Sequence, residues 1–243
     1  MKIIIDGKRI SKQELDQCKK KSYSKAVRAL KQKVTIINDM DAMAKKVTEI
    51  KMQYSYDEIV KLLKNKLLLS EKFIKLACIV SREKRKCSIT EIEMSGISAK
   101  EVIDGIDSLM LKESGKNNEV NLSAYPEHYV LRPLGQNILE VIETTGNSPL
   151  PVQFFIGYDN ETVIQTPRDY SYEYQSTGIA KLKSGEVIGG VRHQFKETEC
   201  GFKARLVVEF PSICPDSLIK SHQMHLACEF SYWFNWIKNL RTK

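Results

Sequence analysis

The sequence predicts an α+β protein with three regions, and three observations support this. Apolar residues at helical spacing fill most of the first 69 residues, and a run of turn formers occupies 144–151. After that run, short strand-like segments precede a last stretch, 216–240, with helical spacing. We expect a basic, mostly helical region over 1–69, a middle domain over 70–145, and an α+β domain over 146–243 with an antiparallel sheet and a terminal helix.

The composition is that of a folded chain without a membrane-spanning segment. Of 243 residues, 42% are hydrophobic and 28% are charged. The apolar runs are far shorter than the roughly 20 residues that cross a bilayer, and the N-terminus lacks the long apolar stretch of a secretory signal. The six cysteines include no C-x-x-C pair. We therefore expect reduced thiols, no membrane partner and a cytoplasmic location.

The N-terminal region carries the positive excess. Residues 1–69 contain 17 Lys and Arg against 8 Asp and Glu, whereas the net charge is −2 over 70–145 and +1 over 146–243. After a small hairpin expected over 3–10, a helix is predicted over 11–33, with Lys21, Lys25 and Arg28 on one face and an apolar stripe opposite. A one-sided basic face is typical of nucleic-acid binding, and it also increases solubility.

Pairs with S/T-x-x-E spacing, the pattern of a capping box, mark three expected helix starts. They are Ser55 with Glu58, Thr90 with Glu93, and Ser98 with Glu101. The last two starts leave room for one short helix over 91–95, a tight turn at 96–97 and a second helix over 99–111. This is the spacing of a helix-turn-helix.

The segments that follow predict a β-hairpin with its tip at 114–118, and then a strand that leads into a helix over 136–143. The order of elements over 70–143 resembles the winged helix-turn-helix domain of bacterial regulators of the multiple-antibiotic-resistance and arsenical-resistance types. The resemblance implies that the helix over 99–111 enters the major groove of DNA and that the hairpin forms the wing.

The resemblance and the basic face together predict a DNA-binding transcriptional regulator with double-stranded DNA as its partner. Its C-terminal domain would serve dimerisation, effector sensing or partner contact, and a homodimer is an open alternative. The expected DNA contacts are Lys21, Lys25, Arg28, Arg85, Lys86, Lys100, Ser108, Lys112 and Lys116.

Two carboxylates argue against this function, because Glu101 and Asp104 lie on the outward face of the helix over 99–111, where they would approach phosphates. Two alternatives stay open for that reason. One is a non-catalytic protein-interaction factor of phage or mobile-element type that uses the winged helix as a protein-binding surface. The other is a replication initiator-like DNA-binding protein.

The C-terminal region contains candidate metal ligands and a row of tyrosines. His222, His225 and Cys228 recur every three residues, but His222 and Cys228 diverge by about 120° around a helix. We therefore expect core residues, no metal and no stoichiometric zinc. The tyrosines at 170, 172 and 174 fit either a base-stacking platform or a half-buried strand, and the strand is favoured.

Motifs of catalysis are missing from the sequence. It has no Gly-rich phosphate loop, no G-x-S-x-G elbow and no H-E-x-x-H. The four histidines come without an evident nucleophile. We expect no cofactor and a protein that is not an enzyme.

Overall fold

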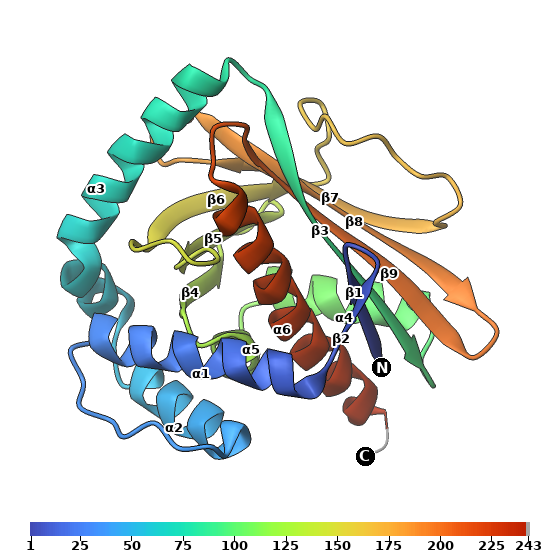
Figure 1. Ribbon diagram of the computed structural model, residues 1–243, viewed down its shortest axis with the longest axis horizontal. Helices are drawn as coiled ribbons and strands as arrows, with labels where there is room; N and C mark the ends of the chain where they lie inside the picture. Colours follow the sequence, from blue (N-terminus) through green and yellow to red (C-terminus); the bar gives the residue numbers. More distant parts are fainter. Residues whose placement is uncertain (242–243) are drawn as a thin grey trace.

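The computed structural model describes residues 1–241, in which nine strands form one antiparallel sheet (Figure 1). The strands lie in the order β2-β1-β3-β9-β8-β7-β6-β5-β4. Their bounds are β1 (Lys2–Ile5), β2 (Lys8–Ile10), β3 (Arg85–Ser95), β4 (His128–Pro133), β5 (Ile138–Glu143), β6 (Val152–Tyr158), β7 (Tyr174–Lys181), β8 (Val187–Thr198) and β9 (Gly201–Pro211).

Helices surround this sheet, and α6 carries much of the core. Figure 1 shows α6 running along the sheet, α1 lying against α6 and α2, and α3 forming one flank of the molecule. Phe234 of α6 packs against Phe195 and Phe202, with ring centroids 6.2 and 5.0 Å apart. The helices are α1 (Lys12–Ala29), α2 (Met40–Met52), α3 (Tyr56–Ser81), α4 (Ala99–Leu111), α5 (Gly115–Ala124) and α6 (Asp216–Leu240).

The ends of several elements follow the predicted local signals. The hairpin β1–β2 turns at Asp6 and Gly7, which both have positive φ, as the Asp-Gly signal predicts. Ser55 and Ser98 begin α3 and α4, each with a complete capping box. The helix predicted over 216–240 is α6. The α+β class, the antiparallel sheet and the long C-terminal helix are therefore confirmed.

The winged helix-turn-helix predicted over 70–143 is wrong. Where the sequence predicts a short helix over 91–95, the structure has strand β3, which pairs with β9 along its whole length. Side chains of β3 alternate between buried and partly exposed, with period two. Thr90, the predicted N-cap, is buried in this strand, and its hydroxyl donates a hydrogen bond to the carbonyl of Gln223 at 2.9 Å.

The predicted wing and exit helix are also absent from the described chain. Residues 115–124 form helix α5 in place of a hairpin tip, and the hydroxyl of Ser114 caps it by accepting from the backbone N–H of Asn117 at 2.9 Å. The segment predicted as a helix over 136–143 is mostly strand β5. Gly135, Gln136 and Asn137 all have positive φ, so they form the turn that reverses the chain between β4 and β5.

Helix α4 forms over the predicted residues, but it does not have the surroundings of a recognition helix. It packs on α6 and on strands β7 to β9, and a Cβ on Gly105 would lie 2.7 Å from the side chain of Ile237. Glu101 pairs with Arg241 at 2.8 Å. Because residues 70–143 contain neither the preceding helix nor the wing, the prediction of a DNA-binding regulator is wrong. The two alternatives built on the same domain, the winged-helix interaction surface and the replication initiator-like protein, are withdrawn with it.

The predicted regions 1–69, 70–145 and 146–243 all contribute strands to the one sheet, and α3 runs across the first boundary. The turn-rich run 144–151 packs against α6: a Cβ on Gly146 would lie 2.9 Å from the carbonyl oxygen of Leu218. The division into three domains remains a prediction about folding units, and the shared sheet argues against it. Within residues 1–241, no helix is long and apolar enough to cross a bilayer.

Candidate functional site

The predicted DNA contacts lie on four separate elements. Lys21, Lys25 and Arg28 are exposed on α1, and their role stays a prediction. Four of the others have side chains that contact neighbours in the fold. These are Arg85 with the carbonyl of Val187 (3.4 Å), Lys86 with Asp216 (2.6 Å), Lys100 with Asp104 (2.6 Å) and Lys116 with Glu119 (3.0 Å). Ser108 and Lys112 contact Asn117 through their backbone carbonyls, at 2.9 and 2.8 Å.

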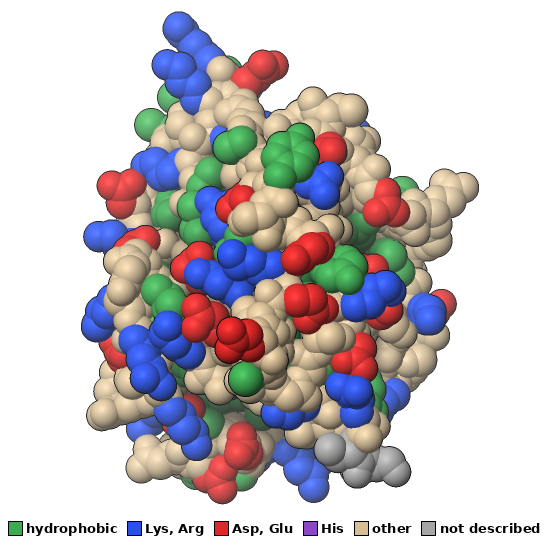
Figure 2. All heavy atoms as spheres, turned by 90° about the vertical axis from the view of Figure 1, so that its right-hand side faces the viewer, with side chains coloured by type: hydrophobic (Ala, Val, Ile, Leu, Met, Phe, Trp, Pro, Cys, Tyr) green, Lys and Arg blue, Asp and Glu red, His purple; other side chains and the backbone are tan. Residues whose placement is uncertain are grey.

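The face drawn in Figure 2 shows basic and acidic side chains interspersed among hydrophobic ones. On the sheet, Lys203 pairs with Glu91 at 3.1 Å. On the face drawn, the mixture of both signs weakens the field that would attract an anionic polymer.

The most apolar of the cavities described is a groove of about 420 Å³ between α3, the sheet and the start of α6. We call it the α3 groove. Its apolar walls come from elements far apart in the sequence. They include Phe73, Ile74 and Ala77 of α3, Val152 and Phe154 of β6, Ala180 of β7, Ile188 of β8, Val208 and Phe210 of β9, and Leu218 of α6.

Within residues 1–241, the α3 groove is lined by carboxyl groups and by no basic side chain of Lys or Arg. Glu143, Glu209 and His222 line it, and none of the described residues that line it is Lys or Arg. Glu209 accepts hydrogen bonds through one oxygen from the backbone N–H and the hydroxyl of Thr166. Its other carboxyl oxygen is buried and has no hydrogen-bond partner in residues 1–241. The groove therefore offers hydrogen-bonding groups but no cation.

The groove opens beside an apolar stripe on α3. Leu69, Phe73, Leu76 and Val80 follow helical spacing and are each about half exposed or more, with Phe73 at 58%. Phe73 belongs to both the stripe and the groove wall, so it marks the mouth of the groove.

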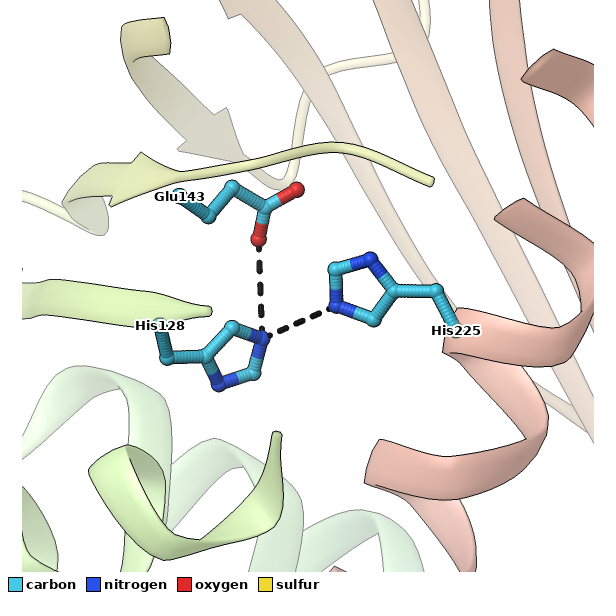
Figure 3. Close-up of side chains that lie close together, drawn as sticks. All are labelled: His128, Glu143 and His225. Atoms are coloured by element: carbon cyan, nitrogen blue, oxygen red, sulfur yellow. Dashed lines mark hydrogen bonds and ion pairs between the residues drawn. The ribbon is translucent and has the colours of Figure 1, made fainter. Parts of the chain in front are cut away.

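A second candidate site is a group of four buried side chains, which we call the His/Glu cluster. Its members are His128, Glu143, His225 and Glu229. Figure 3 shows His128 at the start of β4, Glu143 at the end of β5 and His225 on α6, pointing toward one another. From Nε2 of His128 the distances are 3.1 Å to Nε2 of His225, 3.1 Å to a carboxyl oxygen of Glu229 and 3.6 Å to one of Glu143. Glu229 lies 3.6 Å from Nε2 of His225.

The hydrogen bonds around the cluster fix the tautomer of His128. Its Nδ1 lies 2.9 Å from the backbone carbonyl of Asn121. Because a carbonyl can only accept, Nδ1 carries the proton and the neutral ring has its lone pair on Nε2, directed into the cluster. The ring of His225 stacks on Tyr125 with centroids 3.7 Å apart, and its Nδ1 has no partner within residues 1–241.

Burial shifts the pKa values of the cluster toward neutral forms. It lowers the pKa of His128 to about 4 and that of His225 well below its ordinary value. It raises the pKa of Glu143 to about 7 and that of Glu229 well above its ordinary value. These directions follow from desolvation, because burial disfavours the charged form of each group.

The other candidates from the sequence lie elsewhere. His222 is buried, with Nδ1 3.0 Å from the hydroxyl of Ser88, and Cys228 lies beside the carbonyl of Leu15 at 3.9 Å. His222, His225 and Cys228 therefore have different hydrogen-bonding neighbours. Tyr170 is 84% exposed in the loop before β7, so the predicted strand over 170–174 is wrong except at Tyr174.

The sequence pattern predicts that two members of the His/Glu cluster lie close together. His225 and Glu229 have i,i+4 spacing, which places them on one face of α6. His128 and Glu143 are directly opposite in the β4–β5 ladder, and this pairing follows only once 136–143 is recognised as a strand.

Comparisons with known proteins give little further guidance. No protein-family model matches the chain, and no curated protein matches it. The solved structure of Ara h 8.0201 is similar, with 10% sequence identity and a TM-score of 0.42, over 64% of this chain and 99% of that one. A likeness at this level is too weak to indicate a function.

Proposed function

We propose that this protein binds a neutral, apolar small molecule in the α3 groove. The observation that carries the proposal is the groove itself: about 420 Å³ of space with apolar walls from four strands and two helices. Small-molecule sites have roughly 300–1,000 Å³ and mostly apolar linings. Apolar ligand surface transferred into such a groove contributes about 25 cal/mol per Å².

The charges of the groove favour a neutral ligand over an anion. A carboxylate or phosphate would lie near Glu143 and Glu209, and no described lining residue supplies a positive charge. Burying an unpaired anion is costly, whereas a hydroxyl or carbonyl can use Thr145 or Ser148, which also line the groove. The ligand class is therefore an apolar molecule with at most a neutral polar group.

The prediction that the chain is not an enzyme is compatible with this role and stays a prediction. Binding alone requires only the shape and polarity of the groove. The protein-partner and homodimer alternatives also stay predictions.

The experiment uses a matched pair of ligands. N-phenylnaphthylamine, a neutral fluorophore, is titrated into the full chain at pH 8 and then displaced by decanol or by decanoate. We expect fluorescence to rise on binding and decanol to compete at least about tenfold better than decanoate, because only the second has a charge to desolvate.

A matched pair of variants locates the site. Ala77→Trp fills the α3 groove, whereas Leu76→Trp adds the same side chain one position away, where the residue is 56% exposed and does not line the groove. We expect the first to abolish probe binding and the second to retain it. Equal competition by decanoate, or equal loss in both variants, would contradict the proposal.

A further inference from the structure

The four members of the His/Glu cluster come from two rigid supports. His225 and Glu229 lie one turn apart on α6, and His128 and Glu143 face each other across the β4–β5 pair. All four side chains are nearly inaccessible, none with more than 10% exposure. Ligands held by helix and sheet in this way have fixed directions before anything binds.

The spacing of the donor atoms matches the shell of a small metal ion. Zinc binds imidazole nitrogen and carboxylate oxygen at about 2.0–2.2 Å, and the corners of such a tetrahedron are about 3.3–3.5 Å apart. Four of the six donor-atom pairs, the three of His128 and the pair His225–Glu229, lie 3.1 to 3.6 Å apart. The donor atoms of His128, Glu143 and His225 all lie within 4.8 Å of one another.

The outer nitrogen of the His128 ring is held by a hydrogen bond, as it is in many histidines that bind metals. Its Nδ1–H donates to the carbonyl of Asn121 at 2.9 Å, which leaves Nε2 free to donate a lone pair. Histidine ligands in metal sites have their outer N–H held in this manner. The ring of His225 is held by its stack on Tyr125.

The electrostatics of the cluster also favour a cation. Two carboxyl groups are buried there, and among residues 1–241 no Lys or Arg forms an ion pair with Glu143 or Glu229. A divalent ion would balance two carboxylates and accept the lone pairs of two neutral imidazoles. Glu143 also lines the α3 groove, which gives an entering ion a route.

We propose that His128, Glu143, His225 and Glu229 form a four-ligand site for one divalent transition-metal ion, with zinc as the best match. Imidazole with carboxylate suits zinc and its first-row neighbours better than calcium or magnesium, which prefer oxygen alone. This inference goes beyond the expectation of no zinc, which considered His222, His225 and Cys228 and not the group that the fold assembles. The site shares Glu143 with the α3 groove, but the inference does not rest on the ligand proposed there.

The test measures metal in the full chain, purified without a histidine tag. The protein is incubated with zinc, desalted and analysed by elemental mass spectrometry. We expect one zinc per chain in the wild type. We expect zinc affinity to fall in His225→Ala and Glu229→Gln by more than the about 10–100-fold that loss of a second-shell partner causes. His193→Gln is the matched control, because His193 is buried but lies outside the cluster, and it should keep the wild-type stoichiometry.

Cobalt substitution tests the same site in the wild-type protein, so the result does not depend on whether a variant folds. Bound Co²⁺ in a four-coordinate nitrogen and oxygen site gives intense visible absorption that saturates at one equivalent and disappears when zinc is added. Wild-type protein with substoichiometric zinc and no such spectrum would overturn the proposal. The same conclusion follows if folded His225→Ala retains one zinc, since the metal would then bind elsewhere.

Discussion

At the scale of single residues, the four buried histidines differ in what their Nδ1 atoms contact. In His128 and His222 this nitrogen has a hydrogen-bonding partner, whereas in His193 and His225 it has none within the described chain. His193 lies on β8, edge-on to Phe230 with centroids 5.0 Å apart. Burial alone lowers the pKa of His193 from 6.5 to about 3.

The depressed pKa of His193 predicts a pH dependence of stability. Below pH 6.5 the unfolded chain binds a proton at this residue while the native state does not, so the free energy of unfolding falls as the pH drops toward 3. The slope for one such group is at most about 1.4 kcal/mol per pH unit. Urea unfolding of wild type and His193→Gln at pH 6.5 and 4.5 checks this. The variant should lose less stability between the two, and an equal loss would mean that His193 is protonated in the folded protein.

The sequence pattern predicts the proximity of two residues of the His/Glu cluster but not that of the other two. The i,i+4 pair His225 and Glu229 can be read from helical spacing. The partners His128 and Glu143 cannot, because their approach depends on the β4–β5 register, which the sequence pattern assigns to an exit helix. A site formed between a helix and a distant hairpin is set by tertiary packing, which single-sequence periodicity does not encode.

At the scale of elements, β3 shows how the same residues can fit two local patterns. Thr90 and Glu93 have capping-box spacing, and the alternation from Ser88 to Met94 fits a strand. Pairing with β1 on one side and β9 on the other decides the outcome in favour of the strand. Such long-range ladder bonds outweigh a local cap that contributes about 1 kcal/mol.

Helix α3 combines a buried end with an exposed apolar stripe, and two substitutions on it should separate their contributions. Leu63 is 0% exposed and Leu76 is 56% exposed. We expect Leu63→Ala to lower the free energy of unfolding by about 2–5 kcal/mol, because it leaves a cavity. Leu76→Ala should change it by no more than about 0.5 kcal/mol. Denaturant unfolding measures both, and similar losses would indicate that the stripe is covered in solution.

At the scale of the whole molecule, the sheet joins the two ends of the sequence. Its β3–β9 pair brings residues 85–95 against 201–211. The turn formers at 144–151 predict a boundary, but in the fold this run packs on α6 through Gly146. Sequence composition can locate chain breakers, and it cannot tell a linker from a turn that is held in place.

The shared sheet predicts the behaviour of a fragment. Residues 146–243 expressed alone would lose β3 beside β9 and β5 beside β6. Two new sheet edges and the uncovered core of α6 should leave the fragment without a cooperative thermal transition. Circular dichroism in the near ultraviolet, compared with the full chain, tests this. A cooperative transition in the isolated fragment would support the predicted division at 145/146.

The central claim is that a neutral apolar molecule lies in the α3 groove, and isotope-filtered NMR tests it most directly. Unlabelled decanol is added to full-length protein with labelled isoleucine, leucine and valine methyl groups. We predict nuclear Overhauser effects from the decanol chain to Ile74, Ile188 and Val208, which line the groove. Nuclear Overhauser effects from decanol only to Leu76 and Ile79, on the exposed side of α3, would contradict the claim.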